Sequence, residues 1–255
     1  MNTPCTRTLP ERPAFTFAAG TALLLLIACK GGDSGSAVEA PGADKSARTT
    51  TLEAGAAALQ RMPPIGAINA YLDGFHFYSG RMQQQMEAHH YCAILNEDLI
   101  QCAIYDGNAQ DAKLMGVEYI VSERLFTDLP AAEKSLWHSH VHEVKSGQLI
   151  APGIPQAAEH ALMEKLIHTY GKTWHTWHTD SGDRLPLGVP QLMMGFTADG
   201  QSDPSLVRSR DERFGIDSDA KRADRADIDV PAIDAGADAW QHGATIQITD
   251  PRTSK

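Results

Sequence analysis

Three of the eleven histidines in this chain lie within five residues, two apart each time: His138, His140 and His142. In an extended strand, residues two apart point to the same face, so this spacing predicts a row of imidazoles about 6.5–7 Å apart. Neighbouring imidazoles disfavour each other's protonated forms, which leaves their ring nitrogens free to bind a metal. The pair His138 and His140 is therefore the centre of a predicted metal site.

Histidines on other predicted strands could complete the coordination shell of that site. One predicted strand carries His89 and His90, and an aromatic strand carries His175. Imidazole ligands suit a divalent transition metal such as Zn, Ni, Cu or Fe, and we expect one such ion. Glu143 could be a ligand, an orienting residue or a general base, but strand alternation puts it on the face opposite the row. The predicted ligands are His138, His140, His89, His90 and His175, with Glu143 as a weaker supporting candidate. The alternative is a row of hydrogen-bonded or exposed histidines without a metal.

Other catalytic signatures are absent or weak. The sequence has no Gly-x-Ser-x-Gly elbow, no phosphate-binding glycine loop and no dinucleotide fingerprint. Cys92 near His90 could form a nucleophile and base, but their place on one apolar strand face favours a buried structural thiol. Asp180, Asp183 and Arg184 are typical of a turn with an ion pair. Enzymatic activity stays open, and a non-catalytic role is favoured.

The first 28 residues have the pattern of a secretory signal. Two arginines precede an apolar run from residue 14 to residue 28, which ends at a small residue and is too short to span a bilayer comfortably. The segment Leu26-Ile27-Ala28-Cys29 resembles the lipobox of bacterial lipoproteins, which implies cleavage before Cys29 and acylation of its thiol. A plain signal peptide with an incidental cysteine is the alternative.

Residues 29–51 follow as a small, polar and aperiodic stretch, which predicts a flexible tether. With an acylated Cys29, the chain is expected in the cell envelope, attached to a membrane by its lipid. The residue directly after Cys29 is Lys30 and not an aspartate, which resembles the pattern of outer-membrane lipoproteins in Gram-negative bacteria.

Composition limits the function classes further. The 255 residues are 42% hydrophobic and 21% charged, which is ordinary for one globular domain with appendages. The net charge of −10 and the absence of a basic run argue against nucleic-acid binding. Four cysteines are too few for a disulfide scaffold in a chain of this length.

The remaining periodicities predict one α+β domain over residues 52–251. Strands and helices do not alternate regularly, so we expect a mostly antiparallel sheet with flanking helices and a polar helical C-terminal region. Helices are predicted at 52–61, 128–137, 155–170, 203–214 and 218–225; strands are predicted at 87–94, 99–105, 117–121, 138–142, 173–179 and 244–249. His160, Glu164 and His168 share the polar face of the 155–170 helix, which indicates a solvated surface rather than a metal clip.

Several blocks of the sequence, taken in order, resemble the oil body-associated protein family, which is known in plants and present in bacteria. They include Phe75-His76-Phe77-Tyr78-Ser79-Gly80, Glu87-Ala88-His89-His90-Tyr91-Cys92, Leu136-Trp137-His138-Ser139-His140, Glu143-Val144-Lys145-Ser146-Gly147 and Gly182-Asp183-Arg184-Leu185-Pro186-Leu187-Gly188. The resemblance covers about residues 65–248. It implies lipid-droplet association for the plant members, and it brings no catalytic mechanism or ligand set.

The resemblance also bears on Cys92 and Cys102. The plant members work in a reducing cytosol, which favours free buried thiols; a secreted compartment would permit a disulfide. A three-residue loop over 96–98 would place the two cysteines opposite each other in a hairpin, and a two-residue loop would move them out of register.

Three functions follow as hypotheses. The first is a lipid-anchored protein with a histidine-rich metal or small-ligand site. The second is a metal-dependent enzyme that uses the same site. The third is a non-catalytic structural module or a module that associates with a lipid surface.

Overall fold

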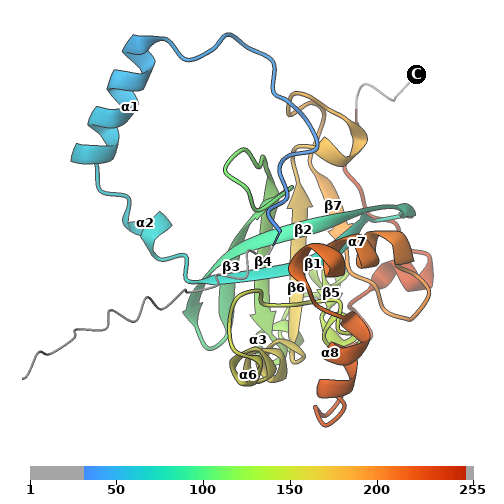
Figure 1. Ribbon diagram of the computed structural model, residues 1–255. Helices are drawn as coiled ribbons and strands as arrows, with labels where there is room; N and C mark the ends of the chain where they lie inside the picture. The colour runs from blue at the N-terminus through green and yellow to red at the C-terminus, as the bar shows by residue number, and fades with distance from the viewer. Residues whose placement is uncertain (1–31, 251–255) are drawn as a thin grey trace, which may run out of the picture.

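A computed structural model describes residues 32–250 and shows an antiparallel β-barrel at the centre of the molecule (Figure 1). The predicted signal over residues 1–28 and the predicted acylation site Cys29 lie outside the described residues. The strands are β1 Ala70–Tyr78, β2 Arg81–Asn96, β3 Leu99–Tyr105, β4 Leu114–Ser122, β5 His138–Ser139, β6 Thr169–His175 and β7 Gln191–Met194.

The sheet closes on itself, and this closure makes the predicted α+β class wrong. The strands follow the order β4-β3-β2-β1-β7-β6, and β4 then pairs with β6 through the register from Gly116↔His175 to Ser122↔Thr169. Irregularities in the β1–β2, β2–β3 and β3–β4 ladders add to the twist that a closed sheet needs. A local sequence pattern predicts strands but not the pairing of β4 with β6, which are separated by 46 residues or more in the chain.

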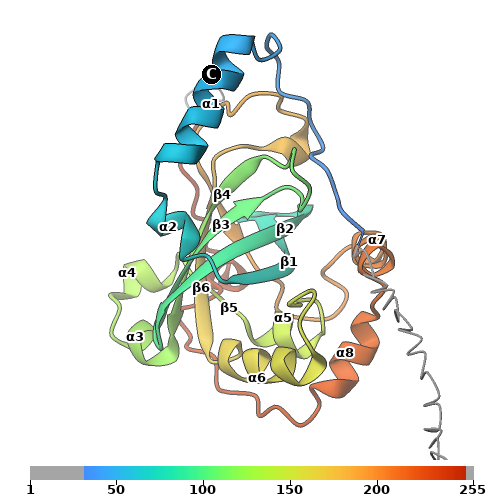
Figure 2. The ribbon, with the colours of Figure 1, turned by 60° about the vertical axis from the view of Figure 1, so that its left-hand side comes forward.

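The helices lie outside the barrel. They are α1 Ala47–Leu59, α2 Pro63–Gly66, α3 Glu123–Thr127, α4 Ala131–Lys134, α5 Val141–Lys145, α6 Gln156–Leu166, α7 Pro204–Phe214 and α8 Ser218–Asp224, with 3₁₀ turns η1 Thr179–Ser181 and η2 Ala239–His242. Helices α3 and α6 lie at one end of the barrel (Figure 2). Helix α1 stands away from the barrel in both views and buries no residue. Residues 244–249, predicted as a strand, are not part of any ladder.

The residues at its two ends explain where helix α7 begins and ends. The carboxylate of Asp203 accepts a hydrogen bond from the Ser205 amide, and Pro204 occupies the first turn, where its missing amide hydrogen costs nothing. Gly215 ends the helix with φ 62°, a left-handed conformation that favours glycine. These boundaries match the helix predicted over 203–214.

The barrel interior has apolar ends and a polar middle. One apolar cluster contains Leu72, Cys92 and Ile120, and the other contains Tyr78, Met86 and Ile104. Between them the inward positions of β1, β2, β4, β5 and β6 carry histidine or glutamate. Burial of large apolar side chains stabilises such a barrel by about 1.5–3 kcal/mol each, so polar groups in its middle call for a separate explanation.

Cys92 and Cys102 form a disulfide between β2 and β3, so the expectation of free thiols is wrong. The hairpin has a two-residue turn, with Asn96 opposite Leu99, but Leu95 is left unpaired. This irregularity restores the register, and Cys92 then pairs with Cys102. The sequence argument treated loop length as the only variable and missed the unpaired residue.

Candidate metal centre inside the barrel

The predicted row of three histidines is wrong beyond its first two members. Strand β5 ends at Ser139, His140 precedes helix α5, and His142 lies on that helix with Nε2 4.0 Å from Asp199 Oδ1. His138 and His140 nevertheless converge, with ring centroids 5.2 Å apart. Their Nε2 atoms lie 3.5 Å and 3.3 Å from Glu118 Oε1.

Glu118 on β4 is the centre of the cluster. Its second oxygen, Oε2, lies 2.9 Å from His90 Nε2 and 4.0 Å from His76 Nε2. The carboxylate is buried, and burial acts to raise its pKa. Hydrogen bonds from His140 and His90 outweigh burial and hold the pKa of Glu118 well below its usual range. One ionised carboxylate is thus surrounded by four imidazoles.

Two further side chains border this group. Glu143 lies on α5, and because a helix replaces the predicted strand it faces the cluster rather than the opposite side. Its Oε2 atom lies 4.0 Å from His138 Nε2 and 3.9 Å from His140 Nε2. His175 on β6 is fully buried, with its ring centroid 5.5 Å from that of His76. We call these seven residues the interior cluster: His76, His90, Glu118, His138, His140, Glu143 and His175.

The buried imidazoles are kept in the form that binds metals. Burial lowers the pKa of His138 and that of His175 to about 3 in each case. Burial and the neighbouring His90 lower the pKa of His76 well below its ordinary value. Neutral imidazole is the ligand form, so these side chains need no deprotonation at neutral pH before they bind an ion. Burial also raises the pKa of Glu143 well above its usual range.

Glycine makes room for this convergence. A Cβ atom on Gly171 would lie 2.1 Å from Glu118 Oε1 and 2.8 Å from the Nε2 atoms of both His138 and His140. A Cβ atom on Gly195 would lie 3.1 Å from Glu143 Oε2. Any larger residue at position 171 would displace the donor atoms from one another.

Many polar atoms of the interior cluster are buried without a hydrogen-bond partner. They are His76 Nδ1, His90 Nδ1, both ring nitrogens of His138 and of His175, and Glu143 Oε2. Buried polar atoms in proteins are almost always paired, so their concentration at one place indicates a ligand. The adjacent cavity, lined by His76, His90, Glu118, His140 and Glu143 together with apolar side chains, has a volume of about 10 Å³. That space suits an ion or a water molecule and excludes an organic substrate.

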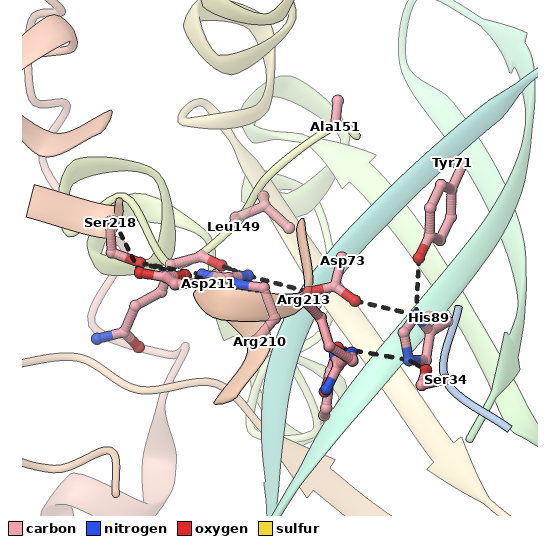
Figure 3. A network of polar contacts seen from close by, with 12 residues as sticks. Ser34, Tyr71, Asp73, His89, Leu149, Ala151, Arg210, Asp211, Arg213 and Ser218 are labelled. Carbon is pink, nitrogen blue, oxygen red and sulfur yellow. Dashed lines mark hydrogen bonds and ion pairs between the residues drawn. The ribbon is translucent and has the colours of Figure 1, made fainter. Parts of the chain in front are cut away.

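His89, predicted as a ligand, lies in a different network on the outer face of β1 and β2 (Figure 3). Its Nδ1 atom is 3.0 Å from Asp73 Oδ2, and its Nε2 atom is 3.2 Å from Ser34 Oγ. Arg210 Nη1 donates to Asp73 Oδ1 at 2.9 Å. Glu87 pairs with Arg213 in the same network. We call this the outer cluster: Tyr71, Asp73, Glu87, His89, Arg210 and Arg213.

The segment that follows Cys29 contacts the outer cluster. We expected a flexible tether over 29–51, but Ser34 and Ser36 hydrogen-bond to Asn108 and Asp106. The Gly32 amide donates to the Arg213 carbonyl at 2.6 Å. The first described residues therefore lie against the barrel.

The sequence pattern predicted that His138, His140, His90 and His175 lie close together, as they do in the structure. It did not identify His76 or Glu118. His76 stands between Phe75 and Phe77, and Glu118 between Val117 and Tyr119. In a closed barrel, alternate residues of each strand face inward, so a lone histidine or glutamate inside an apolar strand is a signal of an interior polar site. That signal could be used only once both faces of the strands were known to be covered.

The comparisons with known proteins match most of the chain. The family described as "Protein of unknown function (DUF1264)" matches residues 62–229. Among curated proteins, oil body-associated protein 1A of Zea mays is 47% identical over 194 residues, which cover 76% of this chain and 82% of the relative. Oil body-associated protein 1B of Arabidopsis thaliana is 44% identical, with 78% and 82% covered. The chain therefore belongs to the DUF1264 family and is a homologue of the oil body-associated proteins.

Membership corrects one expectation and leaves the mechanism open. Oil body-associated protein 2A of Zea mays is also 44% identical, with 78% of this chain and 81% of the relative covered. Because these relatives are named for oil bodies, the expected localisation in the cell envelope is wrong.

No solved structure matches the chain. Between residues 32 and 250, no helix is long and apolar enough to cross a membrane.

Proposed function

We propose that this chain binds a divalent transition metal inside its barrel, with Glu118 and the surrounding histidines as ligands. The observation that carries the proposal is the convergence of four Nε2 atoms, those of His76, His90, His138 and His140, on one buried carboxylate. Neutral imidazoles and a carboxylate are the ligands that Zn, Ni, Cu and Fe accept. The small cavity favours binding over catalysis, since about 10 Å³ has no room for an organic substrate.

Metal content of the purified full chain tests the proposal. The tag-free protein, loaded with Zn²⁺ and dialysed, should retain the ion in stoichiometric amount, and His140→Ala should lose it. His160→Ala and His168→Ala are matched controls, because both side chains lie at the surface and should leave the metal content unchanged. Zinc should raise the unfolding temperature of the wild type, since it binds the native state alone. Equal metal content in wild type and His140→Ala would contradict the proposal.

We also infer that the chain attaches to a lipid surface, with an acyl group on Cys29 as the anchor. The names of the relatives support a lipid surface, and the sequence Leu26-Ile27-Ala28-Cys29 supports acylation. Large apolar side chains are also exposed on α1, on α2 and between these helices: Leu52, Leu59, Met62 and Ile65, at 64%, 85%, 58% and 65%. Exposed apolar groups on the same chain would strengthen attachment, because a single acyl chain binds membranes only marginally.

Flotation of the cell-expressed full chain with phospholipid vesicles tests the anchor. Cys29→Ser should move the protein from the floating fraction to the soluble fraction, and Cys92 is no substitute because it is disulfide-bonded. A variant that floats as strongly as the wild type would show that Cys29 does not anchor the chain.

A further inference from the structure

We propose that the interior cluster binds two divalent ions, bridged by the two oxygens of the Glu118 carboxylate. This inference rests on the proposed metal function and specifies its nuclearity. The donor atoms fall into two groups, and within each group they lie within 4.8 Å of one another. The first group is His138 with His140, and the second group is His76 with His90. The two groups have Glu118 in common.

The first group has three donors close together, and Glu143 is the candidate for a fourth. Glu118 Oε1 lies 3.5 Å from His138 Nε2 and 3.3 Å from His140 Nε2, and Glu143 Oε2 lies 4.0 Å and 3.9 Å from the same two nitrogens. In a tetrahedral site with ligand bonds of about 2.0–2.2 Å, neighbouring donor atoms are about 3.4 Å apart. The Glu118 separations already match this value. Glu143 must approach the two nitrogens by about 0.6 Å and also move towards Glu118 to close the shell, because it lies outside the group whose donor atoms are within 4.8 Å of one another.

The second group lies on the other oxygen of the same carboxylate. Glu118 Oε2 is 2.9 Å from His90 Nε2 and 4.0 Å from His76 Nε2. His175 is the candidate for the fourth side chain: its ring lies 5.5 Å from that of His76, and both of its nitrogens are buried without a partner. It must move towards Glu118 to bind, because it lies outside the group whose donor atoms are within 4.8 Å of one another. A one-ion centre at the first group would leave His175 without a role.

Charge gives the two positions different affinities. The first group has the side chains of both Glu118 and Glu143, so one divalent ion there is neutralised within its own shell when Glu143 releases its proton to solvent on binding. The second group shares only the Glu118 charge, and its ion is also repelled by the first ion a few ångströms away. The first group should therefore fill at lower metal concentration than the second. Carboxylate-bridged pairs of ions about 3.5–4 Å apart are a recurrent arrangement in proteins.

Titration of the metal-stripped full chain with Co²⁺ tests the inference, because visible absorption reports imidazole coordination at each step. The wild type should bind two equivalents in two steps. His76→Ala and His175→Gln should each lose the weaker equivalent and retain the tighter one. Glu143→Gln, nearly isosteric, should weaken the tighter step. His160→Ala, at the surface, should bind as the wild type does.

The outcomes separate this inference from the function beneath it. A single equivalent in the wild type, unaffected by His175→Gln, would overturn the two-ion centre and leave the metal function standing. No bound cobalt in the wild type would overturn both. Circular dichroism of each variant establishes folding, and for a variant that does not fold, Glu118→Asp replaces it: its shortened carboxylate should cost at least one equivalent, and retention of two would count against the bridge.

Discussion

The interior cluster and the outer cluster both contain histidine next to carboxylates, and they differ in what balances the negative charge. Asp73 and Glu87 in the outer cluster face Arg210 and Arg213. Among the ion pairs of residues 32–250, Glu118 and Glu143 have histidine partners and no lysine or arginine. A buried carboxylate needs a compensating cation or a proton. The outer cluster carries its own cations, and in the interior cluster the proposed metal would supply the positive charge.

The ring nitrogens show the same difference. In the outer cluster, Tyr71 and Asp73 occupy Nδ1 of His89, and Ser34 lies 3.2 Å from its Nε2. In the interior cluster, both nitrogens of His138 and of His175 have no hydrogen-bond partner. A histidine and two carboxylates close together, as in Asp73, Glu87 and His89, are therefore insufficient evidence of a metal site. Whether such a group is a metal-site candidate depends on whether neighbouring side chains already pair with its ring nitrogens and carboxylates.

The largest expected effect on stability comes from removal of Arg210, the fully buried arginine of the outer cluster. Arg210 and Asp73 are both fully buried, and Arg210 also donates to the Gln148 carbonyl and the Ser218 hydroxyl. Arg210→Met should lower the free energy of unfolding by about 3–5 kcal/mol, because it leaves a buried carboxylate without its partner. Urea denaturation measures the loss, and the metal content of the folded variant should not change.

Arg222→Met is the matched control for this prediction. The Arg222–Asp199 pair lies at the surface, with side chains 44% and 65% exposed, so its loss should cost less than about 1 kcal/mol. Metal loss in Arg210→Met with retained folding would break the contrast between the two clusters.

The next effect concerns the pH dependence of the metal-free protein. Burial lowers the pKa of His175 to about 3. Below pH 6.5 the unfolded chain binds a proton at this residue and the folded chain does not, so stability falls as the pH decreases from 6.5 towards 3. At pH 5 the difference is about 2 kcal/mol from this group. Urea unfolding in the presence of a chelator at pH 5, 6 and 7 should show a flatter dependence for His175→Gln.

Glu87 in the outer cluster should change stability with pH in the opposite direction to His175. Burial and the neighbouring Asp73 raise the pKa of Glu87 to about 7. The folded chain therefore retains a proton that the unfolded chain has released above pH 4.5, and the contribution to stability is lost as the pH rises through 7. Glu87→Gln should remove this decline between pH 5 and 8. If either Glu87→Gln or His175→Gln kept the pH dependence of the wild-type free energy of unfolding, the corresponding pKa shift would be wrongly assigned.

The strands were more accessible to sequence reasoning than their closure. The hairpin of β2 and β3 follows from apolar residues on both sides of Asn96-Glu97-Asp98, and α7 follows from its cap, proline and terminal glycine. Closure depends on the pairing of β4 with β6 and of β1 with β7, and neither pair is adjacent in the chain. Without closure, Glu118 had no predicted inward face, and the centre of the site was missed.

The histidines show what spacing can predict. His138 and His140 meet as the two-residue spacing indicated, but a turn into α5 brings them together rather than an extended strand. The adjacent residues His89 and His90 were equivalent in the sequence argument. Strand alternation sends His90 to the interior cluster and His89 to the outer cluster, and only the paired structure shows which is which.

The smallest expected effect tests whether Ser34 belongs to the outer cluster. Its hydroxyl lies 3.2 Å from His89 Nε2 and 3.4 Å from Asn108 Oδ1. Ser34→Ala removes one hydrogen-bonding group at a partly buried position and should lower the free energy of unfolding by about 0.5–1.5 kcal/mol. Ser46→Ala is the matched control, because Ser46 caps α1, which buries no residue, and its loss should leave the global unfolding midpoint unchanged. Equal midpoints for Ser34→Ala, Ser46→Ala and the wild type would show that Asp73, Tyr71 and Glu87 hold His89 without Ser34, and that the Ser34 hydroxyl is not part of the outer cluster.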